Sequence, residues 1–245
     1  MTARTPEPSG PTLTAITEAV SALPAQFMLD PKTYASQVDR GYQGMDFYFF
    51  GRAGVLGDVP GQVVAAAMVF FQPELVADCW DRARSVCRPT EAAAAFAGCL
   101  VRWAGEHLPE GPDYPRLADL LGRVAGQASP AGAPLFAGWR LVPEPQDPAA
   151  LALHRLNVLR ELQGALHGAA VLASGLTPYQ AMSVRSPHMV QLFGWGEPLT
   201  DLDAVRPVWQ RAQDATEAAM GRALTVLQPD ERRELGDLLA AAAPR

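Results

Sequence analysis

Hydrophobic and polar positions recur with helical spacing along most of the chain, and the longest such stretch runs from Asp147 to Gly175. Asp147 suits a helix N-cap, Pro148 suits the first helical position, and Gly175 suits a left-handed C-terminal stop. The pattern therefore predicts one helix of roughly seven turns over residues 148–174. One face of this helix is apolar and is made of Val158, Leu162, Ala165, Leu166, Ala169 and Leu172.

A second face of the same helix is polar in its middle, where Arg160, Gln163 and His167 follow one another beside Glu161. Two glycines, at 164 and 168, lie beside these residues, and each costs a helix interior about 1 kcal/mol relative to alanine. We therefore expect a neighbouring element or a ligand to approach this turn closely. Two interpretations stay open: a structural network that satisfies buried polar groups, or the polar wall of an otherwise apolar pocket.

The remaining pattern predicts further helices and no sustained β alternation. The fold class expected is all-α, a multi-helix bundle in two packed halves, with a degenerate winged-helix-like C-terminal half as one option. A Pro- and Gly-rich connection separates the halves. The leader that precedes the first half is expected to be disordered. The expected boundaries are 1–11 for the leader, 12–127 for the first half, 128–147 for the connection and 148–245 for the second half.

Within the first half, a short helix is expected over residues 12–23, ending before Pro24, and another from Pro31 toward Phe50. The second of these carries an aromatic patch that is typical of a core. A glycine-rich loop is expected over residues 51–58. It lacks the lysine of a Walker A motif and the GxGxxG spacing, so phosphate binding is not expected there.

Composition limits the classes of function. The 245 residues are 49% hydrophobic and carry a net charge of −6, which argues against a chain that coats nucleic acid or anionic lipid. Cys79, Cys87 and Cys99 show no metal-binding spacing, and we expect them to be reduced and buried. No apolar run suits a signal peptide or a membrane span, so the prediction is a cytoplasmic protein without membrane contact.

Catalytic patterns are weak. Serines lie near His167 and His188 in the sequence, but no nucleophile elbow accompanies them. His154 and His167 fall on different sides of the long helix, so they cannot hold one metal together. His167 alone suits an axial ligand of a tetrapyrrole, with Phe47, Tyr48 and Met182 as neighbours. The sequence names no reaction, and the cofactor stays unknown.

Three segments carry a family resemblance: residues 51–57, residues 159–167 with Arg160, Glu161, Gly164 and His167, and residues 173–195. Together they resemble the SalK-like family, described as helix-turn-helix proteins of uncharacterised activity, and the similarity extends over most of residues 25–240. This chain has Ala165 where the family has an aspartate.

The resemblance implies a helix-turn-helix in residues 177–193. The segment after Trp195 leaves little room for a β-hairpin wing. The residues that offer base-reading groups there are few, which argues against inherited DNA binding. They are Gln180, Arg185, His188 and Gln191.

These observations favour a helical protein that binds a small molecule, with a tetrapyrrole or another apolar compound as ligand. The candidate contacts are Tyr48, Arg52, Arg160, Glu161, Gln163 and His167. One alternative is a transcription regulator that uses a reduced helix-turn-helix and acts as a homodimer. The other alternative is an enzyme of unassigned reaction.

Overall fold

The computed structural model describes residues 10–244, and in that range it contains helices and no strand. This confirms the all-α prediction. Residues 1–9 of the expected leader lie outside the described residues, whereas Pro11 already belongs to the first helix. The α-helices are α1 Pro11–Leu29, α2 Pro31–Val38, α3 Asp46–Ala53, α4 Gly61–Ala67, α5 Pro73–Ala83, α6 Pro89–His107, α7 Tyr114–Gln127, α8 Pro134–Trp139, α9 Pro148–Ala173, α10 Pro178–Arg185, α11 Val205–Ala223 and α12 Pro229–Ala242. The short 3₁₀ helices are η1 Gly54–Leu56, η2 Pro187–Met189 and η3 Leu224–Val226.

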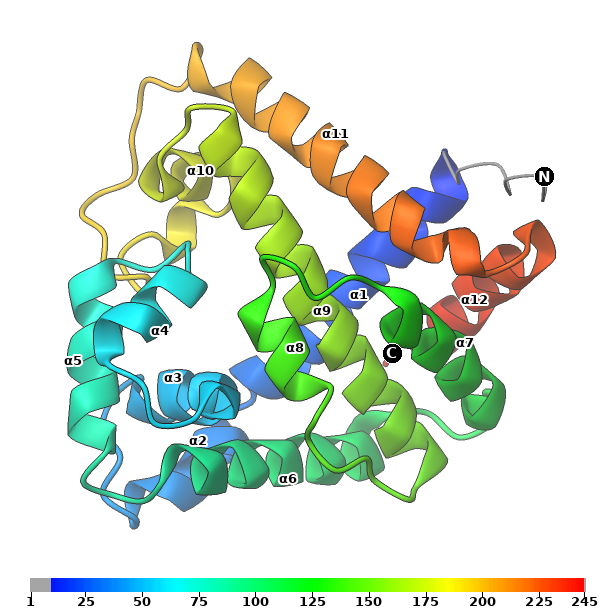
Figure 1. Cartoon of the computed structure of the whole chain (residues 1–245), viewed down its shortest axis with the longest axis horizontal. Helices are drawn as coiled ribbons and strands as arrows, with labels where there is room; N and C mark the ends of the chain where they lie inside the picture. Colours follow the sequence, from blue (N-terminus) through cyan, green and yellow to red (C-terminus); the bar gives the residue numbers. More distant parts are fainter. Residues whose placement is uncertain (1–9, 245) are drawn as a thin grey trace.

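Helix α9 is the axis of the molecule. The side chain of Asp147 accepts a hydrogen bond from the backbone N–H of Ala150 at 2.9 Å, and Gly175 has a φ of 80° just beyond the helix, so both predicted ends are confirmed. Figure 1 shows α9 running through the middle of the fold, where it packs against α1, α6, α7, α8 and α11. Because α9 has neighbours on several sides, different sides of this helix can line different cavities.

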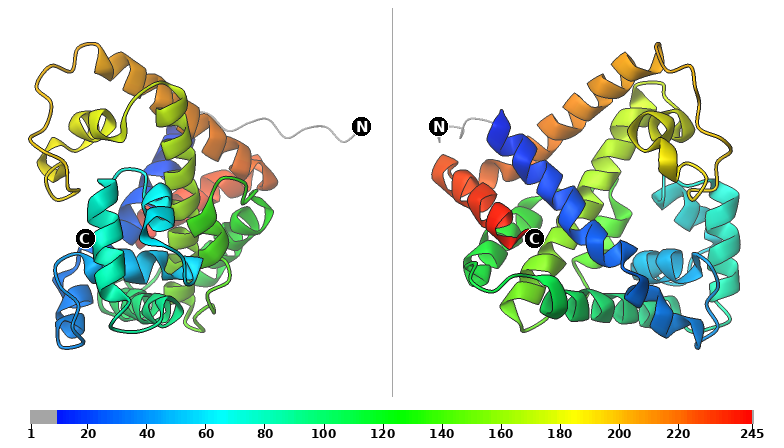
Figure 2. Two further views of the ribbon diagram at one scale, coloured as in Figure 1. Left: turned by 60° about the vertical axis from the view of Figure 1, so that its left-hand side comes forward. Right: turned by 180° about the vertical axis from the view of Figure 1, so that it is seen from behind.

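The other helices form layers around α9. Seen from behind, α1 begins beside α12 and then crosses α9 (Figure 2). Helix α5 packs against both α3 and α4, and α6 closes the lower edge in Figure 1. One large apolar core reaches from α1 to α12, so residues from both sequence halves are buried in it.

The predicted end of the first helix before Pro24 is wrong. Helix α1 continues through Pro24 to Leu29. A proline inside a helix removes one backbone hydrogen bond and costs about 3 kcal/mol. Here Val20, Leu23 and Phe27 are buried on the same helix, and their burial in the core offsets that cost.

The prediction of one helix from Pro31 toward Phe50 is also wrong. The chain forms α2 and α3 instead, separated by a turn in which Gly41 and Gly44 have positive φ angles. The aromatic patch was predicted correctly as core, because all its members are buried. They are Tyr42, Phe47, Tyr48, Phe49 and Phe50.

The expected glycine-rich loop at 51–58 is mostly helical. Residues 51–53 belong to α3, and residues 54–56 form η1. A Cβ on Gly51 would lie 2.8 Å from the ring of Phe96, and one on Gly54 would lie 2.1 Å from the carbonyl oxygen of Pro89. The glycines therefore permit close packing of α3 and η1 on α6.

The connection at 128–147 contains α8, in which Phe136 and Trp139 are fully buried. The indole N–H of Trp139 donates to the backbone oxygen of Arg52 at 2.9 Å. This contact links α8 to α3, one of the helices that line the site described below.

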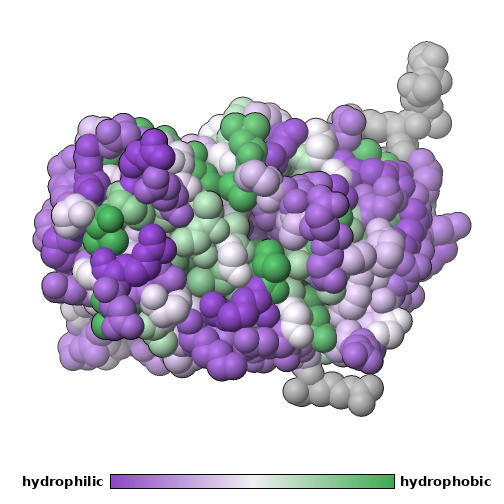
Figure 3. Space-filling model, turned by 90° about the horizontal axis from the view of Figure 1, so that it is seen from below, coloured by the Kyte–Doolittle hydropathy of each residue, from purple (hydrophilic) through white to green (hydrophobic). Residues whose placement is uncertain are grey.

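The apolar face of α9 is buried at Val158 and Leu162 but exposed at Ala169 and Leu172, whereas Val171 at the same end of the helix is buried. On the face seen from below Figure 1, along which α6 lies, hydrophobic residues sit among hydrophilic ones (Figure 3). No described helix has both the length and the apolar composition needed for a membrane span.

Candidate functional site

A cavity of about 540 Å³ lies between α9 and the segment 182–193, and we call it the central cavity. Its other walls come from α1, α3, α11 and the turn after α4. Most of its lining is apolar, including Met28, Met45, Phe70, Phe71, Met182, Met189, Leu192 and Phe193. The second face of α9 supplies its polar wall.

Five of the six candidate contacts line this cavity. Tyr48 and Arg52 come from α3, and Arg160, Gln163 and His167 come from successive turns of α9. Their spacing along α9 places the last three on one side of the helix. The sixth candidate, Glu161, is 2% exposed and does not line the cavity.

Glu161 binds the Arg52 guanidinium on the side that faces away from the cavity. Arg52 Nε and Nη2 donate to the two carboxylate oxygens of Glu161 at 2.7 and 2.8 Å, and Arg52 Nη1 donates to the hydroxyl oxygen of Tyr48 at 2.7 Å. Burial alone would lower the pKa of Arg52, but the carboxylate of Glu161 outweighs burial and raises it. Burial would raise the pKa of Glu161, and the two neighbouring arginines lower it instead. This pair is ionised.

Arg160 is far less well compensated. Its Nη1 lies 3.5 Å from a Glu161 carboxylate oxygen that already accepts a hydrogen bond from Arg52. Removal from water and the charge of Arg52 lower the pKa of Arg160. A second arginine without a carboxylate partner in the described residues, Arg185 of α10, lines the cavity at its exposed edge and donates to the hydroxyl of Ser21 at 3.3 Å.

His167 is held by α11 in one tautomer. The hydroxyl of Thr216 donates to the backbone oxygen of Ala212 at 2.7 Å, so the hydroxyl oxygen is left to accept from His167 Nδ1, which lies 3.0 Å away. Nε2 then carries the lone pair. Burial, and next the charge of Arg185, lower the pKa of His167 to about 4, so the ring is neutral at pH 7.

Three side-chain atoms of this polar wall are buried and have no hydrogen-bond partner in the described part of the chain. They are Arg160 Nε, Gln163 Oε1 and His167 Nε2. Buried polar groups are normally satisfied, because leaving one unpaired costs about 1–3 kcal/mol. The three atoms offer a ligand or water one charged donor and two acceptors.

The two glycines of α9 differ. A Cβ on Gly168 would lie 3.1 Å from the side chain of Val69, so a neighbouring element does approach there. A Cβ on Gly164 would meet nothing within 4 Å, and Gly164 lines the central cavity. The close approach that the sequence predicted occurs at Gly168 only.

The segment 186–195 closes one side of the cavity, and three contacts attach it to the turn after α4. The backbone N–H of Gln72 donates to the oxygen of Phe193 at 2.9 Å, and the indole N–H of Trp195 donates to the oxygen of Phe70 at 2.8 Å. The rings of Phe71 and Phe193 stack with centroids 4.0 Å apart.

Sequence reasoning missed the lining from α1, the role of Arg185 and this closing segment. Two residues at the rim of the central cavity, Leu29 of α1 and Leu192 of the closing segment, have large hydrophobic side chains that are exposed. The available signal was the group of large apolar side chains Met182, Met189, Leu192 and Phe193 in the short segment 182–193.

The predicted base-reading residues are occupied elsewhere. Gln180 accepts from the backbone N–H of Thr177 in a capping box at the start of α10, and Gln191 donates to Glu197 at 2.7 Å. Arg185 and His188 line the central cavity. The element after α10 is the three-residue η2.

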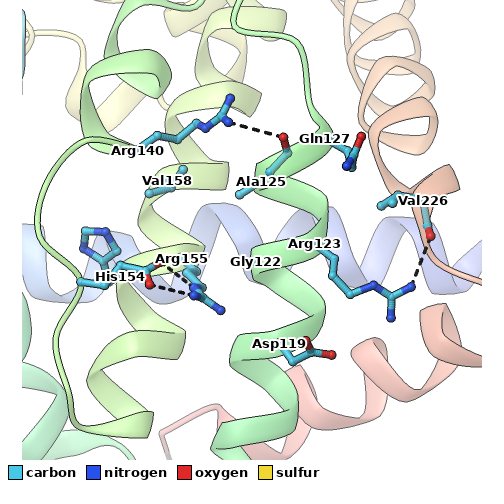
Figure 4. A pocket seen from close by; sticks show the side chains of 12 residues that line it. Asp119, Gly122, Arg123, Ala125, Gln127, Arg140, His154, Arg155, Val158 and Val226 are labelled. Atoms are coloured by element: carbon cyan, nitrogen blue, oxygen red, sulfur yellow. Dashed lines mark hydrogen bonds and ion pairs between the residues drawn. The ribbon is translucent and has the colours of Figure 1, made fainter.

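A second hollow of about 530 Å³ lies between α7, α8 and α9, and we call it the α7–α9 groove. Arg155 donates to both carboxylate oxygens of Glu144 at 2.7 and 2.8 Å and to the backbone oxygen of Ala118 at 2.8 Å. Arg123 donates to the carboxylate of Glu231 at 2.9 Å. It also donates to the backbone oxygen of Val226 at 3.4 Å (Figure 4). Arg123 and Arg155 are therefore paired with carboxylates, whereas Arg140, among the described residues, donates only to the backbone oxygens of Gly126 and Ala128, at 3.4 Å each.

His154 lines this groove and His167 lines the central cavity, which confirms that the two lie on different sides of α9. Within the described residues, no group of three His, Cys, Asp or Glu side chains is arranged to hold a metal ion. The three cysteines are free, as predicted, but Cys87 is partly exposed because it lies in the turn before α6.

The fold and the site define an all-helical protein with an internal, mostly apolar cavity. A family model described as the helix-turn-helix family matches residues 13–199, and the chain belongs to this family. No curated protein and no solved structure matches the chain.

Proposed function

We propose that the protein binds a small, mostly apolar molecule in the central cavity. The observation that carries this proposal is the set of three buried and unpartnered polar atoms, on Arg160, Gln163 and His167, beside a mostly apolar hollow. A few convergent polar groups in an apolar cavity are the usual composition of a small-molecule site.

The size and the rim of the cavity support the same function. Ligand pockets commonly measure about 300–1,000 Å³, and the central cavity falls within that range at about 540 Å³. Leu29 and Leu192 keep more than 45% of their surface exposed at the rim, at 64% and 49%. Exposed apolar side chains gathered at one place mark interaction sites.

The candidate contacts take different roles in this proposal. Arg160, Gln163 and His167 contact the ligand with their unpartnered atoms. Glu161 positions Arg52, and Tyr48 covers the remaining side of the Arg52 guanidinium. Within the helix-turn-helix family, we also propose that the chain is related to the SalK-like group, on the residues quoted above.

N-phenyl-1-naphthylamine, an uncharged dye that fluoresces in apolar surroundings, tests the proposal. We expect saturable binding with about one dye per chain. Gly164→Leu places a side chain into open space in the cavity and should abolish binding. Gly126→Leu is the matched control, since Gly126 also has open space and lines the α7–α9 groove.

Helical circular dichroism and thermal unfolding of both variants should match the wild type. Equal binding by the two variants would contradict the proposal, as would a wild-type protein that binds no dye. Absorption spectra recorded with added haem extend the test to tetrapyrroles: a Soret band that His167→Leu removes would identify His167 as the axial ligand.

A transcription regulator is the second candidate, and membership of the helix-turn-helix family favours it. A DNA-binding dimer would present two recognition helices about 34 Å apart and would bind with strong salt dependence. Selection from a random-sequence DNA pool at two salt concentrations, with native mass spectrometry for the oligomeric state, tests this candidate. A monomer that enriches no sequence would refute it.

A further inference from the structure

We propose that the ligand of the central cavity is an amphipathic organic anion, whose acidic group is bound by Arg160 and Arg185 while its apolar body fills the cavity. This inference rests on the proposed function and deepens it, because it names the chemical class of the ligand.

The balance of charge carries the inference. Three guanidinium groups line the cavity, on Arg52, Arg160 and Arg185, and one carboxylate, that of Glu161, lies behind them. Among the residues that the structure describes, no aspartate or glutamate lines the cavity. Glu161 neutralises Arg52 through two short hydrogen bonds, which leaves two positive charges without a carboxylate of their own.

Arg160 and Arg185 line the same cavity, so their two charges face a shared space. Burial, and next the charge of Arg160, lower the pKa of Arg185. Arginine nevertheless stays protonated in proteins, so both groups remain cationic. An anion between them would relieve the repulsion and would form charge-assisted hydrogen bonds, including one from Arg160 Nε.

The remaining polar atoms define a second requirement. His167 Nε2 and Gln163 Oε1 are unpartnered acceptors, so they match a hydroxyl or N–H donor on the ligand. The apolar part of the lining is rich in methionine, with Met28, Met45, Met182 and Met189. Methionine side chains adapt to irregular apolar shapes. The predicted ligand therefore has an acidic end, one nearby donor and an aromatic or aliphatic body.

Two dyes with the same aromatic body separate the acid from the apolar part. N-phenyl-1-naphthylamine is uncharged, and 8-anilino-1-naphthalenesulfonate carries one sulfonate on the same skeleton. We expect the sulfonate dye to bind at least 10-fold more tightly at low ionic strength. Dodecanoate should likewise displace the uncharged dye at least 10-fold better than dodecan-1-ol, which shows the same preference for a carboxylate.

The variants Arg160→Met and Arg185→Met should remove this preference while the uncharged dye still binds. Arg155→Met is the matched control, because Arg155 lies on the same helix but in the α7–α9 groove. It should keep the wild-type preference. His167→Phe keeps the ring shape but loses the acceptor, and it should weaken the uncharged amine dye several-fold.

The outcomes separate the two proposals. If neither dye binds, the proposed function fails. If both dyes bind equally to the wild type, or if the preference survives in both cavity arginine variants, the protein binds small molecules but the anion inference is overturned.

Discussion

The central cavity and the α7–α9 groove are hollows of nearly equal volume, about 540 and 530 Å³, and both use arginine and histidine from α9. They differ in what those side chains contact. In the groove, Arg155 makes three hydrogen bonds and Arg123 pairs with Glu231. In the cavity, Arg160, Gln163 and His167 each keep a buried atom without a partner. Unsatisfied polar groups, and not volume, distinguish a candidate site from a structural hollow.

The largest expected difference between the two regions concerns their ion pairs. Glu161→Gln leaves the buried Arg52 charge uncompensated, and loss of one partner of a buried pair costs about 3–5 kcal/mol. Glu144→Gln removes the half-exposed partner of Arg155 and should cost less than about 1 kcal/mol. Urea unfolding measures both free energies. Equal losses would show that the buried pair is no more important than the exposed one.

A second comparison concerns pH. Burial lowers the pKa of His154 in the groove and of His167 in the cavity. His167 has a pKa of about 4 in the folded chain against an ordinary value of 6.5. Between these values the unfolded chain binds a proton that the folded chain does not, so stability falls as pH falls from 6.5 to 4. At 1.36 kcal/mol for each pKa unit, the loss is about 3 kcal/mol.

The variant His167→Gln should lose this part of the pH dependence. His188→Gln, which replaces an exposed histidine, should keep it. Urea unfolding between pH 4 and pH 7 measures the slope in each protein. A wild-type slope that persists in His167→Gln would assign the acid sensitivity to other groups.

The smallest expected effect compares two helical glycines. Gly164→Ala fills open space at the cavity wall, and it should stabilise the protein by about 0.5–1 kcal/mol through higher helix propensity. A Cβ on Gly122 would lie 2.4 Å from Arg155 Nη1, so Gly122→Ala should give no gain because Arg155 must move away from Ala118 and Glu144. Thermal unfolding compares the two. A destabilised Gly164→Ala would show that the cavity wall has no free space.

Much of the fold followed from local pattern. Both ends of α9 were predicted correctly, because Asp147, Pro148 and Gly175 act through their own backbone geometry. The capping box at Thr177 and the helix beginning at Pro229 follow from equally local signals. The predicted break at Pro24 was wrong, because burial of the neighbouring side chains of α1 outweighed the local preference of proline.

Part of the candidate site could also be predicted, because it depends on the local period of the helix. Helical spacing alone places Arg160, Gln163 and His167 on one face of α9. Spacing does not reveal that Glu161 pairs with Arg52, 109 residues earlier in the chain, or that Arg185 faces the same cavity. Those contacts depend on how distant helices pack.

The sequence by itself determined that the chain is helical, where α9 begins and ends, and which polar residues share one side of it. These properties depend on backbone dihedral preferences and on a fixed helical period, which act over a few residues. Only the tertiary structure decided that the polar side of α9 meets a mostly apolar hollow and that Thr216 sets the tautomer of His167. It also decided that, among the described residues, Arg160 shares the Glu161 carboxylate with Arg52 and Arg185 has no carboxylate partner. Such properties depend on burial and on pairing across the whole chain, because the energy of a charge or a hydrogen bond is set by its surroundings.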